Sequence, residues 1–86
     1  MPKARVTITA EAVRQIDELP NPIQQRLLRM VSRLQHWPAV SGVRPLRGTL
    51  GRRYRMRTGD YRMQFQVRGD LVVVEKAGHR DGFYDE

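Results

Sequence analysis

Apolar positions in the first half of the chain follow the 3.6-residue period of an α-helix in two neighbouring segments. The first covers residues 10–19, with Thr9 as its candidate N-cap and Pro20 directly after it. The second begins at Asn21, a candidate cap followed by a proline, and its pattern continues to His36. Because so few residues separate the two segments, the helices are expected to form a hairpin.

Alternation of polar and apolar side chains, the period of a β-strand, marks the rest of the chain. It also appears in a short segment, Val6 to Thr9, ahead of the helices. Gly59 and Gly69 separate later alternating segments and are typical of hairpin turns, so those strands should be antiparallel neighbours. These further strands are predicted at residues 43–47, 53–57, 60–68 and 71–77.

The order of these elements predicts the fold class. A strand, a two-helix hairpin and then three or four antiparallel strands indicate an α+β fold with the helices packed on one face of the sheet. The uninterrupted apolar run from Val72 to Val74 is typical of a central strand that is covered on both faces. With 86 residues, the chain should form one domain that spans residues 1–86.

Arginines occupy one face of the predicted sheet. Side chains of a strand point alternately to its two faces, so Arg53, Arg55 and Arg57 share a face. In the next predicted strand, residues 60–68, Arg62 points to one face and the apolar side chains of that strand point to the other. The apolar face that this alternation leaves for the core carries Tyr54, Met56, Tyr61, Met63, Phe65 and Val67. The other face is a cluster of guanidinium groups, which suits a partner that carries phosphate.

The charge of the chain indicates which kinds of molecule it is expected to bind. The net charge is +7, and residues 44–80 alone carry ten basic and three acidic side chains. Of the 16 basic residues, 14 are arginine, whose planar fork matches phosphate oxygens well. Nucleic acid or an acidic protein is therefore the expected partner.

The composition excludes several other classes of protein. Without cysteine, the chain has neither disulfides nor thiolate metal sites, which fits a reducing cytoplasm. No segment has the length and apolar character of a signal peptide or a membrane span. We expect a cytoplasmic protein with no metal or other cofactor.

Four motifs in the chain resemble those of one known family. They are the L-P-N-P break between the helices, G-V-R-P-L-R-G before the main strands, Y-R-M-R-T-G-D-Y-R-M within them and G-H-R-D-G-F-Y near the end. In order and spacing they resemble the RelE/ParE superfamily, the toxin halves of bacterial type II toxin–antitoxin pairs. The resemblance covers nearly the whole chain and implies a RelE-like fold. It also implies a cognate antitoxin protein, whose acidic segment would cover the arginine face.

The superfamily divides by activity. RelE-like members cut messenger RNA in the ribosomal decoding site, whereas ParE-like members act on DNA gyrase. Arg80 in an H-R pair, with Tyr84 four residues later, makes the ending of the chain more similar to the RelE-like branch. This likeness implies a ribosome-dependent mRNA endoribonuclease that inhibits translation. By motif position, the implied site residues are the basic pair Arg55 and Arg57, Arg62 of the G-Y-R-type strand, and the terminal Arg80 and Tyr84. Arg53, on the same strand face as the basic pair, is expected to be solvated or to steer phosphate rather than to act in catalysis.

The chemistry of such a site can be argued from the residue types. Metal-free cleavage of RNA uses the ribose 2′-OH as the nucleophile, so the enzyme must orient it, stabilise the phosphorane and protonate the leaving oxygen. Arg62 and Arg80 are the candidates for stabilising the phosphorane, and Tyr84 for stacking on a base. Some RelE-type ribonucleases have lysines at the positions of Arg55 and Arg57. Arginine does not give up its proton in proteins, so these two are expected to bind phosphate.

Several alternatives stay open. The general base could be His79, could be missing or could come from the ribosome, and histidine is the side chain whose charge changes near neutral pH. Glu75 could pair with a neighbouring arginine or serve as a base. A ParE-like gyrase inhibitor without nuclease activity, or a catalytically inert member that only binds partners, is the alternative function.

Overall fold

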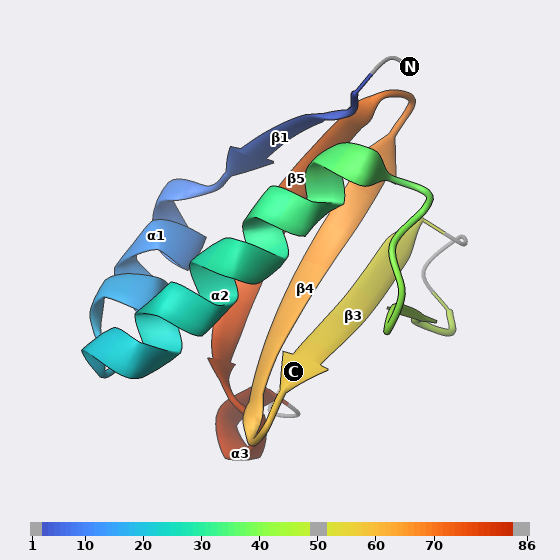
Figure 1. Cartoon of the computed structure of the whole chain (residues 1–86). Coiled ribbons are helices and arrows are strands. Elements are labelled where there is room, and N and C mark those ends of the chain that lie inside the picture. Colours follow the sequence, from blue (N-terminus) through green and yellow to red (C-terminus); the bar gives the residue numbers. More distant parts are fainter. Residues whose placement is uncertain (1–2, 49–51, 84–86) are drawn as a thin grey trace.

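Within residues 3–48 and 52–83, which the computed structural model describes, the chain forms a five-stranded sheet with two helices lying across one face (Figure 1). The strands stand in the order β1-β5-β4-β3-β2. The elements along the chain are β1 (Arg5–Ile8), α1 (Ala10–Asp17), α2 (Asn21–Arg33), the 3-10 turn η1 (Leu34–His36), β2 (Arg44–Pro45), β3 (Arg53–Thr58), β4 (Tyr61–Arg68), β5 (Leu71–His79) and α3 (Arg80–Phe83). The α+β class is confirmed.

The sheet is mixed rather than wholly antiparallel. Strands β3, β4 and β5 pair antiparallel through two hairpins, as predicted, and Gly59 and Gly69 in the turns have φ angles of 60° and 59°. This left-handed backbone is the one that two-residue hairpin turns require. Strand β1, by contrast, pairs parallel with β5, because the helical hairpin returns the chain to the side on which β1 started. The strand predicted at residues 43–47 is reduced to β2, a two-residue pairing with β3.

The end of α1 and the start of α2 differ from the prediction. Thr9 caps α1 as predicted, since its Oγ1 accepts a hydrogen bond from the Ala12 N–H at 3.1 Å. Helix α1 ends at Asp17, two residues early, and the Leu19 N–H then donates to the Ile16 carbonyl at 3.0 Å. The prediction that Asn21 caps the second helix was wrong. Pro20 takes that position, with extended φ and ψ of −59° and 148°, and no side chain caps this end.

The core lies between the helices and one face of the sheet. Its buried apolar side chains are Ala12, Ile16, Ile23, Leu27, Met30, Leu34, Met56, Met63, Phe65, Val72, Val74 and Ala77. Val72 and Val74 are buried but Val73 is only half-buried, so the prediction of a strand covered on both faces was wrong. Helices α1 and α2 belong to one layer, and among the described residues the opposite face, called the open face below, has only the short α3 at one end (Figure 1). No helix among the described residues is long and apolar enough to cross a membrane.

Candidate functional site

The arginines of β3 and β4 lie on the open face. In β3, Tyr54 packs against Trp37 and Phe65 on the core side, and Met56 is only 2% exposed. The pleat therefore turns Arg53, Arg55 and Arg57 away from the core. The strand register then places Arg62 directly across from Arg57, and Arg44 of β2 directly across from Arg55. Residues opposite each other in a ladder share a face, so three strands contribute arginines to one area.

These arginines surround a pocket of about 350 Å³. Its lining consists of Gly42, Val43, Arg44, Arg55, Met56, Arg57 and Arg62, and we call it the arginine pocket. The Nε atoms of Arg55 and Arg62 are buried. No acidic residue is among the described residues that line the pocket, so its potential is strongly positive. Such a site can hold a phosphate group and stabilise negative charge that develops on it.

Arg44 was missed by the sequence reasoning. Its signal was present in the G-V-R-P-L-R-G motif, which predicted a short strand at this point. The face on which Arg44 lies depends on the register between β2 and β3. That register is set by the long connection between the two strands, and alternation alone does not determine it.

Arg53 does not line the arginine pocket, although it lies on the same strand face. Its Nε donates to the Glu75 Oε1 at 2.7 Å, and the Gln64 Nε2 donates to the same oxygen at 3.0 Å. The sequence left Glu75 open between an ion pair and a base, and the structure shows the ion pair. The side chains of Arg53 and Glu75 are 38% and 21% exposed, so this pair is partly shielded from solvent.

Arg80 lies at the end of the sheet near the β3–β4 turn. Its backbone N–H donates to the Asp60 carbonyl at 2.8 Å. Its Nε lies 4.0 Å from the Asp60 Oδ1 and 3.8 Å from the Asp81 Oδ1. All three side chains are more than half exposed, and ion pairs of this kind contribute little because solvent screens them. Arg80 can therefore exchange these carboxylates for a phosphate at small cost.

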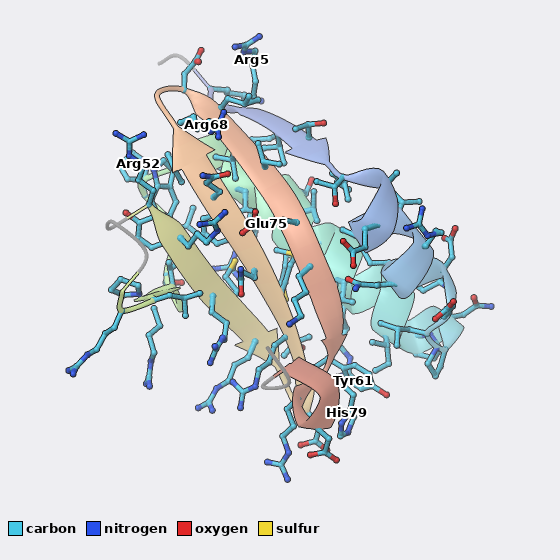
Figure 2. All side chains as sticks on the ribbon, turned by 180° about the vertical axis from the view of Figure 1, so that it is seen from behind. Arg5, Arg52, Tyr61, Arg68, Glu75 and His79 are labelled. Carbon is cyan, nitrogen blue, oxygen red and sulfur yellow. The ribbon has the colours of Figure 1, made fainter. Side chains whose placement is uncertain are left out.

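His79 lies at the same end of the sheet, and Figure 2 shows it beside Tyr61 and next to α3. The two rings meet edge to face, with centroids 5.2 Å apart. The His79 Nδ1 accepts a hydrogen bond from the Asp81 N–H at 3.2 Å. Neither His79 nor Arg80 lines the arginine pocket. Tyr84 lies outside the described residues.

Metal-ligating side chains do not gather anywhere in the part of the chain that the structure describes. No group of three or more histidines, cysteines, aspartates or glutamates there could hold a metal ion. What the described residues do offer is a concentration of fixed positive charge.

The chain is similar to one curated protein and to several solved structures. No protein-family model matches it. It is 24% identical over 85 residues to Toxin RelE3 of Methanocaldococcus jannaschii, covering 94% of this chain and 96% of the relative. The toxin–antitoxin complex RelBE2 of Mycobacterium tuberculosis matches with a TM-score of 0.78 and 26% identity, over 93% of this chain and 94% of the matched chain.

Two further structures extend the comparison. The archaeal RelE–RelB complex of Pyrococcus horikoshii OT3 matches with a TM-score of 0.76 and 29% identity, over 95% of this chain and 99% of the matched chain. The isolated RelE toxin of E. coli matches with a TM-score of 0.75 over 88% of this chain and 83% of its own. Its identity is only 19%, so this last likeness shows the fold alone.

Proposed function

We propose, because the chain is a RelE-like toxin of the RelE/ParE superfamily, that it is a metal-independent endoribonuclease that cuts messenger RNA on the ribosome and thereby inhibits translation. The observation that carries this proposal is the arginine pocket. Three of the residues that the family resemblance implies, Arg55, Arg57 and Arg62, line it together.

The reaction that fits this pocket is an internal transfer at phosphorus. The ribose 2′-oxygen forms a bond to phosphorus as the bond to the 5′-oxygen breaks, which gives a 2′,3′-cyclic phosphate and a free 5′-OH. Negative charge builds up on the non-bridging oxygens of the phosphorane. Fixed guanidinium groups stabilise that charge without moving, which is the largest single contribution that such a site can make.

Each residue has a role in this reaction that follows from its position. Arg62, with its buried Nε, stabilises the phosphorane, and Arg55 and Arg57 bind the phosphate because arginine keeps its proton. Arg80 reaches the same phosphate from the end of the sheet after leaving its exposed carboxylates. Tyr84 stacks on a base and holds it away from its neighbours.

Proton transfer is assigned to His79 or to the ribosome. The Nδ1 of His79 accepts a hydrogen bond from the Asp81 N–H at 3.2 Å, so Nε2 is the ring nitrogen that faces the substrate in this proposal. An imidazole acts as a general base on the 2′-OH when it is neutral and as a general acid on the departing 5′-oxygen when it is protonated.

The test of the cleavage proposal is primer extension on translated messages after brief induction of the protein. We expect new 5′ ends that repeat in phase with codons, because the decoding site presents the message three nucleotides at a time. Supercoiling by purified gyrase should be unaffected. New ends that ignore the reading frame, or no new ends together with inhibited gyrase, would contradict the proposal and favour the ParE-like alternative.

The proposed partner is a small antitoxin protein with an acidic segment. Two of the similar structures are complexes of a RelE protein with RelB, and the open face here has the charge to attract carboxylates. We expect a toxin–antitoxin complex that stays intact in purification when the two genes are co-expressed. Light scattering gives its mass, and a mass equal to that of the 10.0 kDa chain alone would refute this partner.

A further inference from the structure

A second pocket lies on the open face beside the arginine pocket, and Arg55 lines both. Its volume is about 660 Å³. The charged side chains that line this second pocket are Glu11, Arg47, Arg53, Arg55, Glu75 and Lys76. We call it the Glu75 pocket, since Glu75 stands in the middle of the open face, between Arg68 at one end and Tyr61 with His79 at the other (Figure 2).

A local irregularity of the sheet lies at Glu75. Phe65 pairs with Val74 and Gln64 pairs with Lys76, so Glu75 is an additional residue in β5 at that point. A bulge of this kind redirects a side chain without ending the strand. Glu75 itself follows the alternation of β5, since Val72 and Val74 point into the core and Glu75 therefore lies on the open face. The bulge turns Lys76, the partner of Gln64, to the same face.

The Glu75 carboxylate is held in a fixed orientation. Its Oε1 accepts hydrogen bonds from the Arg53 Nε at 2.7 Å and from the Gln64 Nε2 at 3.0 Å. These bonds also fix the plane of the Arg53 guanidinium and the orientation of the Gln64 amide. Because the Gln64 nitrogen donates to Glu75, the carbonyl oxygen is the atom of this amide that can accept a hydrogen bond from a ligand.

The chemistry of the Glu75 pocket differs from that of the arginine pocket. Here the carboxylates of Glu11 and Glu75 offset part of the positive charge of the basic side chains, so this pocket favours a phosphate group less than the arginine pocket does. It suits a nucleobase, because carboxylate and amide oxygens accept hydrogen bonds from base amino groups and a guanidinium plane stacks on base faces. Cytosine, adenine and guanine carry an amino group, and uracil does not.

The spacing of the β3 residues that line the two pockets fits neighbouring nucleotides of one RNA strand. Arg53 and Arg55 are two residues apart in β3, which separates them by roughly 6.6 Å along the strand. A phosphate in the arginine pocket would leave the adjacent base within reach of Glu75. The base would be read in its unstacked, single-stranded state, as is usual for RNA.

We propose that the Glu75 pocket binds the base of a nucleotide next to the phosphate held in the arginine pocket, and that Glu75 and Gln64 favour a base with an amino group over uracil. This inference rests on the proposed RNA-cleaving function and adds a sequence preference to it. Glu75 is thus a specificity residue rather than one that takes part in bond breaking.

The first test measures binding of two single-stranded RNA pentamers by fluorescence anisotropy, one all uridine and one with cytidine at its centre. The unchanged protein should bind the cytidine pentamer about tenfold more tightly. Glu75→Gln should remove most of this preference. Asp70→Asn is the matched control: it makes the same change of charge, at an exposed ion pair with Arg5, and should keep the preference.

The second test reads the sequences around the cuts in translated messages. Uracil should be depleted at one fixed position beside the cut, and Glu75→Gln should restore it there. Gln64→Leu should weaken the depletion of uracil as well. This second variant provides the test if Glu75→Gln does not fold, and thermal unfolding shows whether each variant is folded.

The outcomes separate this inference from the proposed function. Codon-phased cuts without any base preference would overturn the Glu75 inference and leave the nuclease proposal standing. A base preference in the pentamers, together with messages that stay uncut, would support the Glu75 inference and overturn the nuclease proposal. If Glu75→Gln weakens binding of both pentamers equally, Glu75 only positions Arg53 and the inference fails. No preference in either test overturns it as well.

Discussion

At the scale of single residues, the open face places like-charged side chains next to each other, although their repulsion lowers the stability of the fold. Arg57 and Arg62 are direct cross-strand partners, and like charges in this position destabilise a sheet. Met56 and Met63, also cross-strand partners, belong to the core on the opposite face. The buried core thus fixes the register that places the two arginines together. Such a conflict between local stability and position is expected at a functional site.

This conflict predicts the effect of one substitution on stability. Arg57→Gln should raise the free energy of unfolding by roughly 0.2–1 kcal/mol at low salt, because it removes the like-charge pair. The gain should shrink as salt screens the charges. Denaturant unfolding at two ionic strengths measures both effects. Arg68→Gln, whose cross-strand partner is Leu71, is the control, and an equal gain in that variant would contradict the explanation.

At the scale of secondary-structure elements, periodicity predicted most of the fold. The helical spacing of Ile23, Leu27 and Met30 gave the buried face of α2, and alternation gave β3 and β4 with the correct face inward. These patterns succeed because one face of each element is buried and the other is not. The same alternation predicts that Arg55, Arg57 and Arg62 share one face of the sheet.

Pairings between distant elements could not be predicted in this way. The parallel pairing of β1 with β5 depends on where the helical hairpin leaves the chain. The bulge at Glu75 is visible only in the register between β4 and β5. The bond from the Ala77 N–H to the Gln15 Oε1, at 2.8 Å, likewise joins residues 62 positions apart. The place of Arg44 depends on such long-range contacts and was not found from the sequence. For Glu75 the sequence left an ion pair with an arginine and a role as base open, and the contact with Arg53 decides between them.

At the scale of the whole molecule, the two faces of the sheet have separate tasks. Helices α1 and α2 cover one face and supply the core, which leaves the other face available to a partner (Figure 1). Most of the +7 charge comes from the part of the chain that builds β2 to β5. Such a charge attracts polyanions and speeds their approach, and more strongly at low salt. An antitoxin that covers the open face would compete with RNA for the same arginines.

The most direct test is the single-turnover rate at which the protein cleaves a message held in the ribosomal decoding site. We expect Arg62→Ala and Arg80→Ala each to cleave about 10²–10³-fold more slowly than the unchanged protein, while thermal unfolding shows that both variants remain folded. Arg29→Ala removes an exposed arginine from α2 and should cleave at the unchanged rate. A rate for Arg62→Ala equal to that of Arg29→Ala would contradict a catalytic role of the arginine pocket.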